Sequence, residues 1–151
     1  SDLAHESAGG GKPIEELNSD ELYNLGLDLE DLDQNQAKNV YQRAASLDPT
    51  NVDAIINLGR ILQLEGDFKM AKQAYERGLS LNPRHELANY NLGTIFDELD
   101  ETSIASSYYE KAPNVPDAHY NLARLKELAG DQVSAKRHLQ LYKELVELEG
   151  F

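Results

Sequence analysis

The spacing of apolar positions along the chain predicts helices and no strands. In residues 52–85, apolar side chains recur three and four positions apart, first at Leu58, Ile61 and Leu62, then at Ala71, Ala74 and Tyr75. This spacing places them on one face of a helix, whereas a strand would alternate with a period of two. Gly or Asp residues interrupt the pattern at 33–34, 66–67, 100–101 and 130–131. Such residues end one helix and cap the next, so the sequence predicts paired helices.

The pattern repeats from about residue 19 onward. By subtraction, a small residue recurs at intervals of 33, 34 and 30, at Gly26, Gly59, Gly93 and Ala123. A second series, at intervals of 34, 34 and 30, consists of Ala37, Ala71, Ala105 and Ala135, and a bulky residue stands four positions after each, namely Tyr41, Tyr75, Tyr109 and Leu139. A fixed period of this length is typical of proteins whose repeated units bury their cores against each other. We expect a repeat domain over residues 19–151, with units at about 19–51, 52–85, 86–115 and 116–151, the last including a capping helix.

Residues 1–18 differ from the repeats and indicate a flexible N-terminal arm or linker. They contain three consecutive glycines, Gly9 to Gly11, and Pro13, with few apolar residues. The linker is favoured over a phosphate-binding loop because Pro13 follows Lys12 where Ser or Thr is needed, and no strand pattern precedes it.

At the repeated positions the chain resembles the tetratricopeptide repeat family, whose unit carries W-x2-L-G-x2-Y, A-x3-F and P over about 34 residues. The second unit reads Ile55-x2-Leu58-Gly59-x2-Leu62, then Ala71-x3-Tyr75 and Pro83. The resemblance covers about residue 19 to the end. It implies an all-α fold, a right-handed α-solenoid of four tetratricopeptide-like helical hairpins.

The third unit departs from the family pattern. Pro113 and Pro116 replace the usual final turn and loop of its second helix. Because proline cannot continue a helix, we expect that helix to stop near Ala112.

In this family the first helices of the units line a concave groove, and the residue before the Leu-Gly pair points into it. That residue is asparagine in every unit here, at Asn24, Asn57, Asn91 and Asn121. An asparagine offers a donor and an acceptor, which suits the amides of an extended peptide. The alternative is that these side chains bond to a neighbouring helix and recur through duplication of the unit.

Tyrosine and arginine flank the asparagines. Tyr90 and Tyr120 stand beside them, and Arg60 and Arg124 lie one helical turn further on. Two cations on the inner face would attract a ligand carboxylate. The alternatives are an arginine paired with Glu127 or another neighbouring acid, and tyrosines that pack between units.

Charge restricts the class of partner. The 151 residues include 14 basic and 27 acidic side chains, a formal charge of −13, with a pI near 4.6. Such a chain repels nucleic acid and anionic membranes, so we expect no direct nucleic-acid binding. Long-range attraction favours a basic partner near the first unit, where Asp28, Glu30 and Asp31 cluster. The longest run without charged residues, 87–96, is too short to insert into a membrane.

No catalytic or metal-binding arrangement is visible in the sequence. There is no cysteine, and the four histidines, His5, His85, His119 and His138, show no i, i+4 pair. His119 takes the place of the family's first large core residue, where we expect it to be packed. We therefore predict neither cofactor, metal site nor enzymatic activity.

The predicted function is a non-catalytic protein–protein interaction module or scaffold, cytoplasmic, that binds a partner peptide in its concave groove. An alternative is a regulatory or self-assembly module of a larger bacterial protein such as a transcription regulator. An enzyme is the third alternative. The family's clamp for acidic chaperone tails is not matched, because Asp117 stands where the clamp has a lysine.

Overall fold

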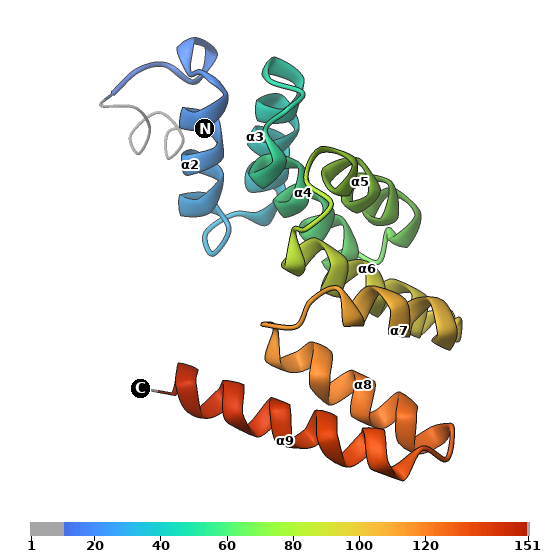
Figure 1. The fold of residues 1–151 in the computed structure, drawn as a ribbon. Coiled ribbons are helices and arrows are strands. Elements are labelled where there is room, and N and C mark those ends of the chain that lie inside the picture. Colours follow the sequence, from blue (N-terminus) through green and yellow to red (C-terminus); the bar gives the residue numbers. More distant parts are fainter. Residues whose placement is uncertain (1–10, 151) are drawn as a thin grey trace. The chain divides into compact units, whose positions relative to one another are not determined.

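The computed structural model describes residues 11–150, and this part of the chain holds α-helices, one short 3-10 helix and no strand (Figure 1). The chain divides into two compact units, Ser1–Asn82 and Pro83–Phe151. Unit 1 contains η1 (Ile14–Glu16), α2 (Ser19–Leu29), α3 (Gln34–Leu47), α4 (Val52–Leu64) and α5 (Phe68–Leu81). Unit 2 contains α6 (Glu86–Glu98), α7 (Thr102–Glu110), α8 (Pro116–Leu128) and α9 (Gln132–Glu149). Each unit is thus two helical hairpins, and the predicted all-α class is confirmed.

The helix ends lie where Gly and Asp interrupt the apolar pattern. Asp33, Asp67 and Asp131 precede α3, α5 and α9, and each carboxylate accepts a hydrogen bond from a backbone amide in the first turn, at 3.2, 3.2 and 3.0 Å respectively. These bonds satisfy amides that have no partner within the helix. Gly66 and Gly130 follow α4 and α8 with φ of +83°, a conformation that glycine adopts without strain.

The close approach of the two helices in a hairpin requires the small residue of the repeat. A Cβ atom built at Gly26, Gly59 or Gly93 would lie 2.2, 2.8 or 2.8 Å from a ring carbon of Tyr41, Tyr75 or Tyr109, respectively. All three rings are at most 1% exposed. The glycine therefore makes room for the tyrosine of the second helix. In the last hairpin both members change together, to Ala123 and Leu139.

The proline pair shortens α7 as expected. This helix ends at Glu110 after 9 residues, whereas α3 and α5 have 14. Pro116 is the first residue of α8, a position where its missing amide costs nothing.

Packed residues of unit 1 begin before residue 19, inside the segment that the sequence assigns to an arm or linker. Leu17 is 3% exposed and belongs to the same core cluster as Leu22 and Leu25, and Ile14 packs against that cluster. The end of the predicted linker is therefore part of unit 1, because burial of its two apolar side chains favours an ordered segment. The glycines at positions 9 and 10 lie outside the described residues.

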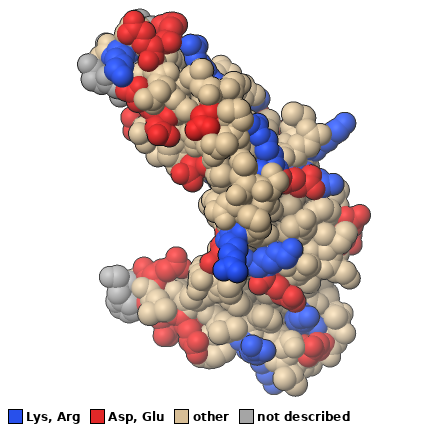
Figure 2. All heavy atoms as spheres, turned by 45° about the horizontal axis from the view of Figure 1, so that its top comes forward, with Lys and Arg blue, Asp and Glu red and all other residues tan. Residues whose placement is uncertain are grey.

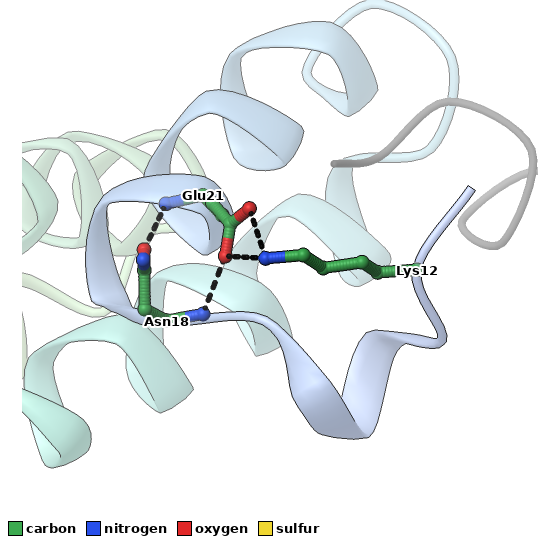
Figure 3. Close-up of polar contacts among 3 residues, drawn as sticks. All are labelled: Lys12, Asn18 and Glu21. Carbon is green, nitrogen blue, oxygen red and sulfur yellow. Dashed lines mark hydrogen bonds and ion pairs between the residues drawn. The ribbon is translucent and has the colours of Figure 1, made fainter. Parts of the chain in front are cut away.

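A capping box joins this segment to α2 (Figure 3). The backbone amide of Asn18 donates to the Glu21 carboxylate at 3.0 Å, and the backbone amide of Glu21 donates to the side-chain oxygen Oδ1 of Asn18 at 2.8 Å. Lys12 Nζ lies 2.9 Å from the same carboxylate. The backbone bond from Asn18 and then the contact with Lys12 lower the pKa of Glu21. The start of α2 is thus fixed by reciprocal bonds.

Candidate peptide-binding surface

All eight predicted site residues lie on the first helix of a hairpin. Asn24 is on α2, Asn57 and Arg60 are on α4, Tyr90 and Asn91 are on α6, and Tyr120, Asn121 and Arg124 are on α8. Their exposure differs: Asn24 is exposed, Asn57 and Asn121 are half-buried, and Asn91 is buried. The shared register therefore does not give the four amides the same surroundings.

Two of the asparagines bond to a tyrosine of the preceding hairpin. In unit 1, Asn57 Nδ2 donates to the Tyr41 hydroxyl at 3.4 Å. In unit 2, Asn121 bonds to the Tyr90 hydroxyl, whose pKa is raised by burial and by Asp117 while this bond opposes the shift. These contacts match the alternative in which the amides bond to a neighbouring helix.

Asn91 differs from the other three asparagines because its side-chain nitrogen is buried without a hydrogen-bond acceptor. The residue is 9% exposed, and its Nδ2 atom is buried with no hydrogen-bond partner. A buried donor without an acceptor costs about 1–3 kcal/mol relative to a satisfied one. Buried polar groups in proteins normally have a hydrogen-bond partner, and an acceptor on a bound ligand would supply one here.

Arg60 is paired with an acid within unit 1. Its guanidinium donates to the carboxylate of Glu30, the residue that follows α2. The other carboxylate oxygen of Glu30 accepts the hydroxyl proton of Tyr41. Burial first, and then the hydrogen bond to Glu30, raises the pKa of Tyr41. One acid thus connects α2, α3 and α4.

Unit 2 repeats this arrangement with a different acid. The Tyr109 hydroxyl donates to Asp97 Oδ2 at 2.8 Å, and Arg124 donates to the same oxygen. Asp97 is at the end of α6, Tyr109 is on α7 and Arg124 is on α8. Of the two predicted alternatives, both arginines therefore follow the pairing with a neighbouring acid, although the partner of Arg124 is Asp97 and not Glu127.

The arginines keep an exposed edge beyond these ion pairs. The side chains of Arg60 and Arg124 are 34% and 43% exposed, whereas those of Glu30 and Asp97 are 19% and 15% exposed. A guanidinium has five N–H donors, and each arginine spends one of them on its acid in this structure. The acid therefore orients the cation, while about a third or more of each arginine side chain remains exposed to solvent.

The second hairpin has a neutral version of the contact. There the Tyr75 hydroxyl donates to Gln63 Oε1 at 2.8 Å. Gln63 occupies the register position of Glu30 and Asp97, and Thr94 that of Arg60 and Arg124. The acid that pairs with an arginine in this way therefore belongs to the first and to the third hairpin.

The distribution of charge differs between the units. Residues 1–82 carry 7 basic and 15 acidic side chains, and residues 83–151 carry 7 and 12. In Figure 2 acidic side chains gather at the end of unit 1 next to its grey N-terminal residues. Unit 1 is therefore the more acidic of the two.

The structure brings together two histidines that the sequence left apart. His119 Nδ1 lies 3.0 Å from His138 Nδ1, and the two rings stack with centroids 5.3 Å apart. His119 is 7% exposed, in agreement with its expected packing. The repeat register could have predicted this contact, because His119 and His138 occupy the positions of Ile55 and Ala74 in the second hairpin, one on each helix. The two histidines are 19 residues apart on different helices, so they do not show the i, i+4 spacing of a pair within one helix.

Two negative findings apply to residues 11–150. No group of three or more His, Asp or Glu side chains in that range is arranged to hold a metal ion. None of the helices there is long and apolar enough to cross a membrane.

The comparisons with known proteins identify the fold. Residues 29–89 match the sequence model of the tetratricopeptide repeat. A crystal structure of MamA aligns with a TM-score of 0.75 and 25% identity, covering 88% of this chain and 81% of that one. MamA from Desulfovibrio magneticus RS-1 gives a TM-score of 0.72 at 24% identity, covering 88% and 78%. PilF from Pseudomonas aeruginosa gives 0.74 at 23% identity, covering 84% of this chain and 60% of that one. The predicted tetratricopeptide solenoid is confirmed.

No curated protein matches the chain. The tetratricopeptide fold is a protein–protein interaction scaffold and is generally non-catalytic. The fold by itself does not choose a partner.

Proposed function

Since the chain is a tetratricopeptide-repeat protein, we propose that it binds an extended peptide of a partner protein along the first helices of its hairpins. In unit 1 these are α2 and α4, and in unit 2 they are α6 and α8. The proposed contacts are the amides of Asn24, Asn57, Asn91 and Asn121, the rings of Tyr90 and Tyr120, and the exposed edges of Arg60 and Arg124. We propose no cofactor and no catalytic role.

The observation that carries the proposal is the amide of Asn91. Its Nδ2 atom has no partner although 91% of the residue is buried, by subtraction from its 9% exposure. A main-chain carbonyl of a bound peptide would accept this proton and remove the cost of the unpaired donor. For this contact to form, the Asn91 side chain would have to rotate so that its amide reaches that carbonyl.

The arginines support a second type of contact in the same surface. Arg60 and Arg124 are held by Glu30 and Asp97 on one side and face solvent on the other. A carboxylate of the ligand would bind the free N–H groups without displacing the internal acid, because a guanidinium presents its donors along more than one edge. The internal acid weakens this attraction by partly neutralising the cation.

The charge of unit 1 supports a ligand with a basic segment. Asp28 and Asp31 are exposed near the end of α2. Attraction of this kind raises the association rate more than the final affinity, and it acts over about 8 Å at physiological salt. We therefore place the basic segment on unit 1.

The test is selection of extended peptides from a random library on the whole chain, followed by titration calorimetry of the selected sequences. Selected peptides should be enriched in Lys and Arg. Asn91→Ala should weaken binding about tenfold, the equivalent of about 1.4 kcal/mol. Raising the salt concentration should slow association.

The matched control is Asn39→Ala, which removes an exposed asparagine from α3, a second helix of a hairpin. It should bind like the unchanged chain. If Asn57→Ala combined with Asn91→Ala binds the selected peptides as tightly as Asn39→Ala does, the proposal is wrong.

Self-association is a second candidate, and a specific exposure favours it. Leu139 on α9 takes the register position of Tyr41, Tyr75 and Tyr109, yet it is 37% exposed. Val146, two turns further along the same helix, is 42% exposed. These side chains offer an apolar face to a second copy. Light scattering that shows only a monomer at all concentrations would remove this candidate.

A further inference from the structure

His119 and His138 share a hydrogen bond inside the last hairpin. His119 lies on α8 and His138 on α9, and their Nδ1 atoms are 3.0 Å apart. The other ring nitrogen of His119, Nε2, lies 2.8 Å from the backbone carbonyl oxygen of Pro113. His119 therefore touches both the loop before its helix and the helix that follows it.

The Pro113 contact fixes the position of the protons. A carbonyl oxygen only accepts, so His119 Nε2 must carry the proton, and Nδ1 of the neutral ring is an acceptor. The previous hairpin has the same contact: Asn89 Nδ2 donates to the carbonyl of Pro83 at 3.2 Å, six residues earlier in both cases. His138 must then donate from Nδ1 to His119 Nδ1.

This geometry has room for one added proton and not for two. A first proton on His138 Nε2 leaves the shared hydrogen bond intact. A second proton has to enter His119 Nδ1, where it would face the N–H of His138 at 3.0 Å. Two donors and two positive charges would then oppose each other, so doubly protonated rings cannot keep this contact.

The charged groups around the pair act mostly in the same direction. Burial first, and then His119, Arg137 and Lys126, lowers the pKa of His138, while Glu110 opposes them. Arg137 is on α9, Lys126 is on α8 and Glu110 is on α7. The elements packed on the pair thus contribute two cations and one acid.

We propose that the His119–His138 pair is an acid-sensitive latch that holds α9 on α8 and is released when both rings are protonated. The unfolded hairpin takes up a proton on each histidine near pH 6.5, whereas the folded pair resists the second one. Because the unfolded state then binds more protons, the stability of this hairpin falls as the pH drops below about 6.5. If α8 binds peptide as proposed above, acid also weakens its contacts, but the latch does not depend on that function.

The test combines NMR of the histidine ring nitrogens with amide hydrogen exchange on the whole chain, with a chelator present. At about pH 7.5, His119 should be the Nε2–H tautomer and His138 the Nδ1–H tautomer. At about pH 5, amides of α9 should exchange about tenfold faster than at pH 7.5 after correction for the intrinsic rate. Amides of α2 and α3 should change much less.

Residues at the same repeat positions in other hairpins suggest how to replace each histidine. His119→Asn keeps the donor to the Pro113 carbonyl, as Asn89 does in the previous hairpin, and His138→Ala copies Ala74 of the second hairpin. Each should remove most of the excess exchange of α9 in acid. The matched control is His85→Asn, which removes another histidine of unit 2 and retains a residue suited to cap α6. It should behave like the unchanged chain.

Three results would overturn the latch. One is that both histidines titrate independently near pH 6.5. Another is that α9 exchanges no faster in acid. The third is that His138→Ala shows the same acid response as His85→Asn. If His119→Asn does not fold, the tautomers of the unchanged chain and the response of His138→Ala still decide the question.

Discussion

Arg60 of α4 forms an ion pair with Glu30 at the end of α2, and thereby joins the first helices of the two hairpins in unit 1. Arg124 and Asp97 form the corresponding pair in unit 2. In both places a buried tyrosine hydroxyl shares the acid. The two arginines that the sequence predicts as ligand contacts thus also connect neighbouring repeats.

Removal of Asp97 should cost more stability than removal of its arginine. Asp97→Ala leaves the hydroxyl of Tyr109, a residue that is 1% exposed, without its acceptor, which should cost about 1–3 kcal/mol. Arg124→Ala should cost about 0.5 kcal/mol, because the arginine side chain is 43% exposed and water screens the ion pair. Urea unfolding followed by circular dichroism measures both, with Glu98→Ala as the exposed control. Equal losses in the two variants would contradict the central role of the acid.

Gly93→Ala should destabilise unit 2 although alanine is the better helix former. The added Cβ would lie 2.8 Å from the ring of Tyr109, and overpacking of this kind costs about 1–3 kcal/mol. The gain in helix propensity offsets about 1 kcal/mol of that. Combining the change with Tyr109→Leu copies Ala123 and Leu139 of the last hairpin. A double-mutant cycle in which Gly93→Ala costs the same with and without Tyr109→Leu would disprove the steric explanation.

Leu17→Ala should cost about 2–4 kcal/mol in unit 1, because it empties a buried position of the core cluster. Leu32→Ala is the matched control, since Leu32 is 68% exposed and should lose almost nothing. Thermal or urea unfolding compares them. If the two variants are equally stable, the segment before α2 does not contribute to the packed unit and the boundary at residue 18 stands.

Stability should fall in alkali as the buried tyrosines ionise. Burial, and then the neighbouring acid, raises the pKa of Tyr41 and of Tyr109 above the ordinary value of 10.0. A raised pKa favours the folded state below about pH 10 and loses this contribution as the pH rises through the folded value. Among the 8 tyrosines, ultraviolet titration of tyrosinate should show a late group, which includes Tyr41 and Tyr109 together with Tyr23 and Tyr90, whose pKa values burial also raises. In Tyr41→Phe the late group should lose one member, whereas in Tyr120→Phe, which changes a tyrosine that is 52% exposed, it should keep all of its members.

The repeat register was predictable because it depends on local chemistry. The repeat pattern gave each of the first three hairpins a small residue such as Gly59 and a bulky one such as Tyr75 at fixed positions, the carboxylate of Asp67 caps the helix that follows it, and Pro113 cannot continue α7. Each of these effects acts within one hairpin or a single turn. The order of small, bulky and capping residues was therefore enough to predict the helical repeats.

The partners of the polar side chains were decided by the tertiary structure. The sequence placed Arg124 in the correct register but could not choose between a ligand, Glu127 and another neighbouring acid, and the structure pairs it with Asp97. It also left His119 and His138 unrelated, and assigned Leu17 to a linker. Register fixes which faces of two helices meet, because backbone periodicity and side-chain volume repeat. The pairing of donors with acceptors depends on the separation and tilt of the packed helices. That geometry is set only when the unit folds.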